Sequence, residues 1–211
     1  LSTGLAYVPG RYSTTEEIVR LAQATQPFGG VYATHMRNQG RHIREAIEEA
    51  VRVGREAGVR VQISHIKLAE EAVWGNYALI TAPIAAARQA GLEVYTDQYP
   101  YTATSSQFTS SFPSWAVAGG HAAFVARMQD PEQRARARQA LIDKRLTSVR
   151  GLDPLERIYV AGSTAHPDYD GQTLGALLRR QGRALMAESA ADLIIDMEME
   201  DQPLAVFFQM D

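Results

Sequence analysis

The sequence contains no cysteine among its 211 residues. It can therefore form no disulfide and no thiolate metal site, so any metal ion must be held by imidazole, carboxylate or water. Long apolar runs are also missing. None approaches the ~20 residues that a helix needs to cross a bilayer, and no positively charged segment precedes an apolar stretch at the start. We expect a chain that is not membrane-anchored, with the cytoplasm as its default location.

An excess of positive charge is absent as well. The 21 lysines and arginines are outnumbered by 24 aspartates and glutamates, which gives a net charge of −3. Nucleic acids and anionic membranes both favour a basic face, so we expect neither as a partner, and a small-molecule substrate remains open. A hydrophobic content of 45% is enough for a globular chain with a substantial core.

A repeated unit is present instead. An apolar, strand-like run followed by an amphipathic helix recurs about every 30 residues up to residue 97. The strands are expected at residues 4–8, 31–35, 59–65 and 92–97. Ser13 or Thr14 begins the first helix as a capping box, Gly58 ends the second, and the third, at about residues 77–89, contains Pro83.

Strand, helix, strand at this spacing predicts right-handed crossovers and a parallel sheet. The candidates are a (β/α)8 barrel and a doubly wound sheet. No Gly-x-Gly-x-x-Gly follows any strand, so the dinucleotide-binding form of the doubly wound sheet has no support. We therefore predict an α/β fold, a partial (β/α)8 TIM-type barrel with parallel strands.

The repeat breaks down after residue 101. Residues 102–114 are rich in Thr, Ser and aromatic residues, and residues 130–144 form a charged helical stretch. We predict three parts: barrel repeats at 1–101, an inserted loop and helical segment over the active-site face at 102–168, and a helical return at 169–211. Further helices are expected at about 173–182 and 189–199. Both ends of the sequence are interpreted as cuts through a larger protein.

Two histidines stand at the carboxyl ends of consecutive predicted strands. His35 closes the second strand and His65 the third. In a (β/α)8 barrel this edge is the rim of the active site, and imidazoles from neighbouring strands converge there. For either residue alone, satisfying a strand end is the simpler interpretation. Equivalent positions in successive repeats favour a shared divalent metal ion, with zinc preferred.

Three charged residues lie close to these positions in the sequence. Asp97 follows the next strand and could be a third metal ligand, could orient an imidazole, or could cap the following loop. Lys67 and Arg37 each lie two residues beyond a histidine. Each could pair with a substrate carboxylate or remain a solvated surface charge.

Several stretches, in this order and spacing, resemble signatures of the D-aminoacylase, or N-acyl-D-amino-acid deacylase, branch of the amidohydrolase superfamily. They are LSTGLAYVPG at 1–10, GVYATHMR at 30–37, ISHIK at 63–67 and DQYPY at 97–101. GQTL at 171–174 and AVFFQM at 205–210 resemble the stretch that leads into the last barrel strand of this family. The resemblance covers nearly the whole chain.

The resemblance implies metal-dependent hydrolysis of an N-acyl-D-amino acid to a carboxylate and a free D-amino acid. His35 and His65 would be zinc ligands from the fifth and sixth strands. The substrate side would contain Tyr7, Lys67, Tyr99 and Ser105, with Lys67 as the partner of the amino-acid carboxylate. Trp115, Phe108 and Phe112 in the insertion could form apolar walls or could simply pack.

The chain also departs from the family pattern. In the family, a His-x-His on the first strand and a further ligand from the third strand complete the metal site, and this chain contains no His-x-His. The catalytic aspartate is expected beyond Asp211, which itself resembles the acidic residue that opens the next helix. The catalytic residue is therefore unknown, and we interpret the chain as a C-terminal-half fragment that is inactive alone.

Two alternatives stay open. The same scaffold also supports other amidohydrolase reactions, such as cyclic-amide or dihydroorotase-like hydrolysis, although Lys67 and the Tyr99-Pro100-Tyr101 segment favour the acyl-amino-acid version. In the second alternative the chain is a non-catalytic piece that packs or binds a partner. An incomplete barrel exposes unpaired strand edges, which favours self-association.

Overall fold

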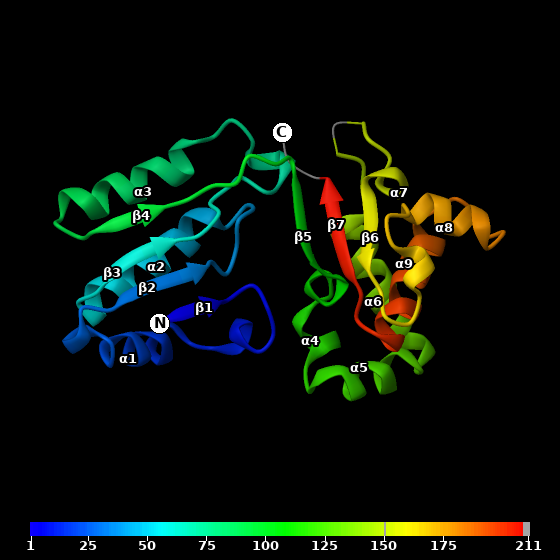
Figure 1. Ribbon diagram of the computed structural model, residues 1–211, viewed down its shortest axis with the longest axis horizontal. Coiled ribbons are helices and arrows are strands. Elements are labelled where there is room, and N and C mark those ends of the chain that lie inside the picture. The colour runs from blue at the N-terminus through cyan, green and yellow to red at the C-terminus, as the bar shows by residue number, and fades with distance from the viewer. Residues whose placement is uncertain (150, 209–211) are drawn as a thin grey trace. The chain divides into compact units, whose positions relative to one another are not determined.

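The computed structural model describes residues 1–149 and 151–208 (Figure 1). Its contacts divide the chain into two compact units. The first is Leu1–Pro100, and the second begins at Tyr101 and takes in the rest of the described chain. No helix in the described ranges is both long and apolar enough to span a membrane.

The first unit is built on a four-stranded parallel sheet with helices between successive strands. The strands are β1 (Ser2–Gly4), β2 (Val31–His35), β3 (Arg60–Ile63) and β4 (Val94–Thr96), and they lie in the order β1-β2-β3-β4. The helices are α1 (Thr15–Gln23), α2 (Ile43–Ala57) and α3 (Ala78–Gln89), with 3-10 turns at Gly10–Tyr12, Gln26–Phe28 and Glu71–Val73. The predicted α/β class with a parallel sheet is confirmed.

The helices of this unit cover one face of the sheet. Alternate strand residues, among them Tyr32, Val61 and Ile63, are buried in one core with apolar residues of the helices. Helix α2 packs against both α1 and α3, so all three lie on that face. A doubly wound sheet needs helices on both faces and a reversal of strand order, and the described first unit shows neither.

Local sequence signals set the helix ends. The Thr14 hydroxyl accepts a hydrogen bond from the Glu17 amide at 3.2 Å, so Thr14 rather than Ser13 caps α1. Gly58 ends α2 at a φ of 68°, a left-handed conformation that glycine adopts without strain.

Within α2, a β-carbon on Gly54 would lie 2.2 Å from the Val61 side chain. Glycine at this position allows α2 to approach the sheet closely.

The first strand differs from the prediction. It was expected at residues 4–8, but β1 ends at Gly4 and the chain then turns. The Tyr7 amide donates to the Gly4 carbonyl at 3.1 Å. A β-carbon on Gly10 would lie 2.6 Å from that carbonyl oxygen, so glycine is required where the turn folds back. Tyr7 therefore lies on a turn beyond the end of β1 and not on a strand.

The second unit contains a sheet of a different kind. Strands β5 (Ala103–Gln107), β6 (Ile158–Gly162) and β7 (Leu204–Phe208) form an antiparallel sheet in the order β5-β7-β6. The helices are α4 (Ser114–Val117), α5 (Gly120–Met128), α6 (Pro131–Arg145), α7 (Pro154–Arg157), α8 (Leu174–Arg180) and α9 (Ala187–Glu200), with 3-10 turns at Phe108–Ser111 and Pro167–Tyr169. Central strand β7 lies after the predicted boundary at residue 168, but both strands that it pairs with lie before that boundary. Whether this unit covers an active-site face stays a prediction.

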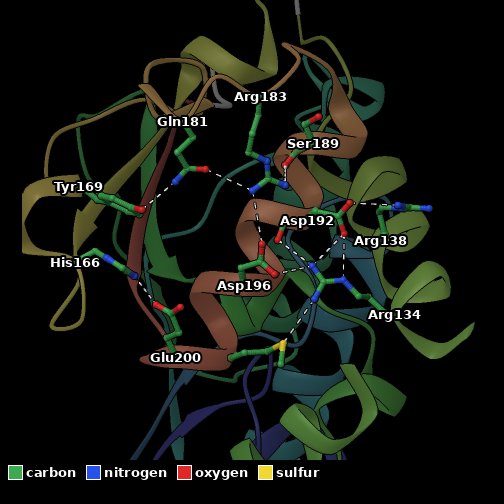
Figure 2. A network of polar contacts seen from close by, with 11 residues as sticks. Arg134, Arg138, His166, Tyr169, Gln181, Arg183, Ser189, Asp192, Asp196 and Glu200 are labelled. Atoms are coloured by element: carbon green, nitrogen blue, oxygen red, sulfur yellow. Dashed lines mark hydrogen bonds and ion pairs between the residues drawn. The ribbon is translucent and has the colours of Figure 1, made fainter. Parts of the chain in front are cut away.

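A network of charged side chains ties α6 to α9 within the second unit (Figure 2). Arg134 Nη2 lies 2.6 Å from an Asp196 oxygen and 3.2 Å from an Asp192 oxygen. Arg138 approaches the other Asp192 oxygen at 3.2 Å, and Arg183 approaches Asp196 at 3.6 Å. Two aspartates one turn apart on α9 are thus neutralised by arginines from α6 and from the loop after α8.

Candidate functional site

The two predicted histidines meet at the carboxyl edge of the parallel sheet. His35 is the last residue of β2, and His65 follows β3, the next strand in the sheet. His35 Nδ1 lies 2.9 Å from His65 Nε2, and the ring centroids are 4.4 Å apart. The convergence expected from the strand register is present. The metal-binding role of the pair remains a prediction.

Asp97 holds the turn that carries His65. The His65 backbone has a φ of 41°, which is unusual for a residue other than glycine. The Asp97 carboxylate accepts the His65 backbone N–H at 2.5 Å and the Gln62 side-chain amide at 2.6 Å. Asp97 was left open as a metal ligand, an imidazole orienter or a cap of the loop that follows it. These contacts instead fix the turn after β3, and they place neither Asp97 oxygen on an imidazole.

Polar and aromatic side chains surround the pair. The Tyr7 hydroxyl lies 3.4 Å from His35 Nδ1, and its ring centroid is 4.5 Å from that of His35. Lys67 Nζ donates to the His65 carbonyl at 2.9 Å and lies 5.0 Å from the centre of the Tyr99 ring. Three of the four residues predicted on the substrate side therefore gather beside the imidazoles.

The fourth predicted substrate residue belongs to the other unit. Ser105 lies on β5, with its side chain exposed to solvent. Its role in substrate binding remains a prediction. The aromatic residues considered as pocket walls are in the same unit, where Phe108 and Phe112 are fully buried in the core. These two phenylalanines are packing residues. The Trp115 ring lies beneath the Arg136 guanidinium, with 4.3 Å between Arg136 Cζ and the ring centroid.

One member of the site was missed by the sequence analysis. The Gln39 side-chain nitrogen lies 3.1 Å from His65 Nδ1, the ring nitrogen that faces away from His35. Gln39 is 9% exposed, an unusual burial for a glutamine. It stands in an irregular segment between β2 and α2, so neither strand alternation nor helical period could predict which way its side chain points.

Burial lowers the pKa values of His35, His65 and Lys67. Burial, together with the His65 ring and the Lys67 ammonium, lowers the pKa of His35 to about 4. Burial and Lys67 also lower the pKa of His65 below its ordinary value. Burial lowers the pKa of Lys67 to about 8, although Asp97 opposes the shift. At neutral pH the site therefore combines two neutral imidazoles with a largely protonated lysine.

Neutral imidazoles suit a divalent cation, because each offers a lone pair and needs no deprotonation. Nδ1 of His35 and Nε2 of His65 face each other, so both lone pairs can be directed to one point between the strands. Within residues 1–149 and 151–208, no group of three or more metal-binding side chains comes together. The described residues therefore bring together two imidazoles and no third side chain of this kind.

Arg37 is not available to a substrate carboxylate. Its guanidinium forms a two-point ion pair with Glu49, at 3.0 Å through Nε and 2.9 Å through Nη2. It also donates to the backbone carbonyls of Arg11 and Ser13, each at 3.0 Å. The substrate-binding interpretation of Arg37 is therefore replaced by a structural one. Asp211 lies outside the described residues.

Comparison with known proteins gives relatives of one kind. The chain is 43% identical over 106 residues to a D-aminoacylase of Alcaligenes xylosoxydans xylosoxydans, half of this chain and 22% of that protein. It is 30% identical over 181 residues to an N-acyl-D-glutamate deacylase of the same organism, 86% of this chain and 29% of that protein. No protein-family model matches the chain.

Solved structures agree with the sequence matches. The crystal structure of a D-aminoacylase, described as defining a novel subset of amidohydrolases, matches with a TM-score of 0.69 and 29% identity. An N-acyl-D-glutamate deacylase of Bordetella bronchiseptica, complexed with zinc and a phosphonate inhibitor that mimics the tetrahedral intermediate, matches with a TM-score of 0.68 and 25% identity. Each match covers all of this chain and 34% of the other, so the chain spans about a third of these relatives.

Proposed function

We propose that this chain, a homologue of the D-aminoacylases and N-acyl-D-amino-acid deacylases, supplies part of the active site for hydrolysing the amide bond of N-acyl-D-amino acids. The observation that carries the proposal is the meeting of His35 Nδ1 and His65 Nε2 at 2.9 Å beyond neighbouring parallel strands. Barrel enzymes place their catalytic groups at this edge. The solved structures that match this chain are those of a D-aminoacylase and an N-acyl-D-glutamate deacylase.

We further propose that the first unit is a segment of a (β/α)8 barrel. Its strand order is sequential, and its helices lie on one face. The opposite face carries side chains such as Ala33 and Gln62, which the helices do not cover. In a closed barrel this face would form the interior. The four strands would correspond to the fourth to seventh of the barrel.

In this proposal His35 and His65 hold a divalent metal ion. Zinc is favoured because imidazole is a preferred zinc ligand and a related deacylase was solved with zinc. When bound, such an ion polarises the scissile carbonyl and lowers the pKa of a water molecule. The two imidazoles transfer no proton themselves, since the lone pairs that face each other are used to hold the ion.

Holding an ion fixes the tautomer of His65. Its Nε2 must then be bare, so the ring proton must reside on Nδ1. That proton needs an acceptor, and Lys67, whose ammonium lies 3.4 Å from Nδ1, has none to offer. The Gln39 side chain can accept if its amide presents oxygen instead of nitrogen. Gln39 would thus orient His65 in the metal-bound state.

The substrate side of the proposal consists of Tyr7, Lys67 and Tyr99 in the first unit. Lys67, with a pKa of about 8, is mostly cationic at pH 7 and would pair with the carboxylate of the D-amino acid. Its approach to the Tyr99 ring holds the ammonium beside the imidazoles. The carboxylate that moves the proton from water to the leaving amine is expected beyond Asp211.

The proposal is tested with the longest natural polypeptide that carries this sequence. We expect it to hydrolyse N-acetyl-D-amino acids and to leave their L enantiomers and hydantoin intact. Lys67→Met should raise KM strongly with a smaller loss of kcat, because the lost contact holds the part of the substrate that does not react. Cleavage of hydantoin, with no effect of Lys67→Met on its KM, would favour the cyclic-amide alternative.

A further inference from the structure

The turn that carries Tyr7 is held from outside by an ion pair. Residues 5–13 connect β1 to α1 and contain a single 3-10 turn at Gly10–Tyr12. Arg37, two residues beyond His35, donates to the carbonyls of Arg11 and Ser13 from two different guanidinium nitrogens. The same guanidinium donates a hydrogen bond to each carboxylate oxygen of Glu49 on α2. One side chain thus joins the turn to a helix of the core.

Contacts inside the turn carry this restraint to Tyr7. The Arg11 amide donates to the Tyr7 carbonyl at 2.7 Å. The Arg11 guanidinium donates to the carbonyl of Ala6, the residue before Tyr7, at 2.6 Å through Nη2. Arg11 therefore fixes the backbone on both sides of Tyr7, and Arg37 holds the Arg11 carbonyl in turn.

Glu49 anchors the far side of the same group. Its side chain is only 13% exposed, and besides the two bonds from Arg37 it accepts the Thr15 hydroxyl at 2.8 Å. Thr15 is the first residue of α1, so both the middle of the turn and its exit are tied to one carboxylate. On the other side, the Leu5 amide donates to the His35 carbonyl at 2.9 Å and fixes the entry.

We propose that the Arg37–Glu49 pair is a positioning device that holds the Tyr7 ring against His35. The pair needs the planar guanidinium fork, which reaches a carboxylate and two carbonyls in fixed directions, whereas a lysine is a point donor on a flexible stem. A role of this placement in catalysis rests on the function proposed above. The placement of Tyr7 by Arg37 and Glu49 is independent of that function.

The test uses the 211-residue chain and four single variants, of which Tyr7→Phe tests the direction of the restraint. Arg37→Lys keeps the charge but loses the fork, and Glu49→Gln keeps the shape but loses the charge. Arg44→Lys is the matched control, since Arg44 also pairs with a glutamate, Glu48 at 3.0 Å, on the exposed face of the same helix. Hydrogen exchange of the amides of residues 5–13 reports the turn, and a nuclear Overhauser contact between the Tyr7 and His35 rings reports the placement.

We expect amides of residues 5–13 to exchange about 10-fold faster in Arg37→Lys and Glu49→Gln, because charge-assisted bonds that hold the turn are lost. The contact between the Tyr7 and His35 rings should weaken in both variants and persist in Arg44→Lys. Tyr7→Phe should leave the hydrogen-exchange rates of the amides of residues 5–13 unchanged, because Arg37 holds the turn and the turn in turn holds Tyr7. An intact ring contact in Glu49→Gln would overturn the proposal even if Arg37→Lys failed to fold.

A kinetic arm separates this inference from the proposed function. In the longest natural polypeptide that carries the sequence, Arg37→Lys should lower kcat/KM for N-acetyl-D-amino acids, and should lower it no further in a Tyr7→Ala background. Additive losses would mean that Arg37 does not act through Tyr7. If no deacylase activity is found at all, the proposed function fails, while the exchange and ring-contact measurements still decide the positioning role.

Discussion

Nδ1 of His35 lies 2.9 Å from Nε2 of His65, a separation that two bare lone pairs would not tolerate. At this distance either one of the two nitrogens carries a proton or both direct lone pairs at a shared cation. The amide orientation of Gln39 decides between these arrangements: its nitrogen would leave His65 Nδ1 as the acceptor, whereas its oxygen would accept a proton from Nδ1 and leave Nε2 free for the ion. The second arrangement is the one that the proposed metal site requires.

Zinc binding should therefore depend on both histidines equally. We expect the 211-residue chain to bind zinc weakly, since a catalytic site usually has three protein ligands, and His35→Ala or His65→Ala to abolish binding. Isothermal titration calorimetry with zinc alone measures the affinity. His42→Ala is the control, because His42 is an exposed residue before α2. Unchanged zinc affinity in both site variants would remove the metal-site proposal.

Gln39 offers a second test of the same site. Gln39→Met removes the acceptor for the Nδ1 proton of His65 and should weaken zinc binding by about 10- to 100-fold, as for other groups that orient a ligand. Gln39→Glu retains an acceptor and should bind zinc at least as tightly as the unaltered chain. Equal affinities for the Met and Glu variants would show that Gln39 does not orient His65.

Much of the first unit follows from the sequence, because its signals are local. The apolar period, the Thr14 cap and Gly58 fix three helices, and their spacing fixes a parallel sheet, in which residues ending neighbouring strands must meet. The pairing of His35 with His65 is a consequence of that register. Gln39 and the engagement of Arg37 could not be predicted, since both depend on side-chain directions in irregular segments.

The second unit shows where such reasoning fails. Helices α6, α8 and α9 were anticipated, whereas the antiparallel sheet was not. Strand β5 reads ATSSQ, which lacks apolar alternation, and its partner β7 lies about a hundred residues away along the chain. Nothing local to either segment specifies this pairing, which becomes favourable only when Ala205 and Phe207 are buried against the helices.

Glu198 should make the second unit less stable as the pH rises. This α9 residue is 1% exposed, and its burial raises the pKa to about 7 from an ordinary 4.5, although a hydrogen bond from Thr109 opposes the shift. Between these pH values the folded chain holds more protons here than the unfolded chain. The free energy of unfolding therefore falls as the pH rises through that range and is then constant for this group.

Glu198→Gln should abolish this fall. At pH 8 the variant should be more stable than the unaltered chain by up to about 3 kcal/mol, the cost of ionising a carboxyl with such a pKa. Urea unfolding at pH 5 and pH 8 measures the difference. Glu188→Gln, which alters an exposed carboxylate in the first turn of the same helix, is the control. A variant that is less stable at pH 8 would mean that ionised Glu198 stabilises the fold.

The network in Figure 2 should depend most on Arg134, which contacts both aspartates of α9. Arg134→Met should lower the free energy of unfolding by about 1–2 kcal/mol, because two half-buried carboxylates lose their shared donor. Arg179→Met should cost under about 0.5 kcal/mol, since its pair with Glu156 is exposed. In a Trp74→Phe background, Trp115 fluorescence reports the second unit during urea unfolding. Equal losses in the two variants would contradict a special role for Arg134.

The last prediction concerns catalytic competence: the 211-residue chain alone should show no measurable deacylase activity, even with added zinc. Its described residues bring two imidazoles together, and no third metal-binding side chain joins them. A site with two protein ligands binds zinc weakly and leaves the ion poorly fixed. The proton-transferring carboxylate is also expected elsewhere, and general acid–base catalysis alone contributes roughly 10² to 10⁴ in rate.

Asp97 is the residue that could contradict this expectation. Its carboxylate now holds the His65 amide and the Gln62 side chain, but it lies at the same sheet edge as the imidazoles. The measurement is turnover of N-acetyl-D-methionine and N-acetyl-D-glutamate by the purified chain and by Asp97→Asn. Robust hydrolysis that disappears in the variant would identify Asp97 as the catalytic carboxylate. Because the variant also disturbs the His65 turn, the ring contact between His35 and His65 must persist for that conclusion to hold.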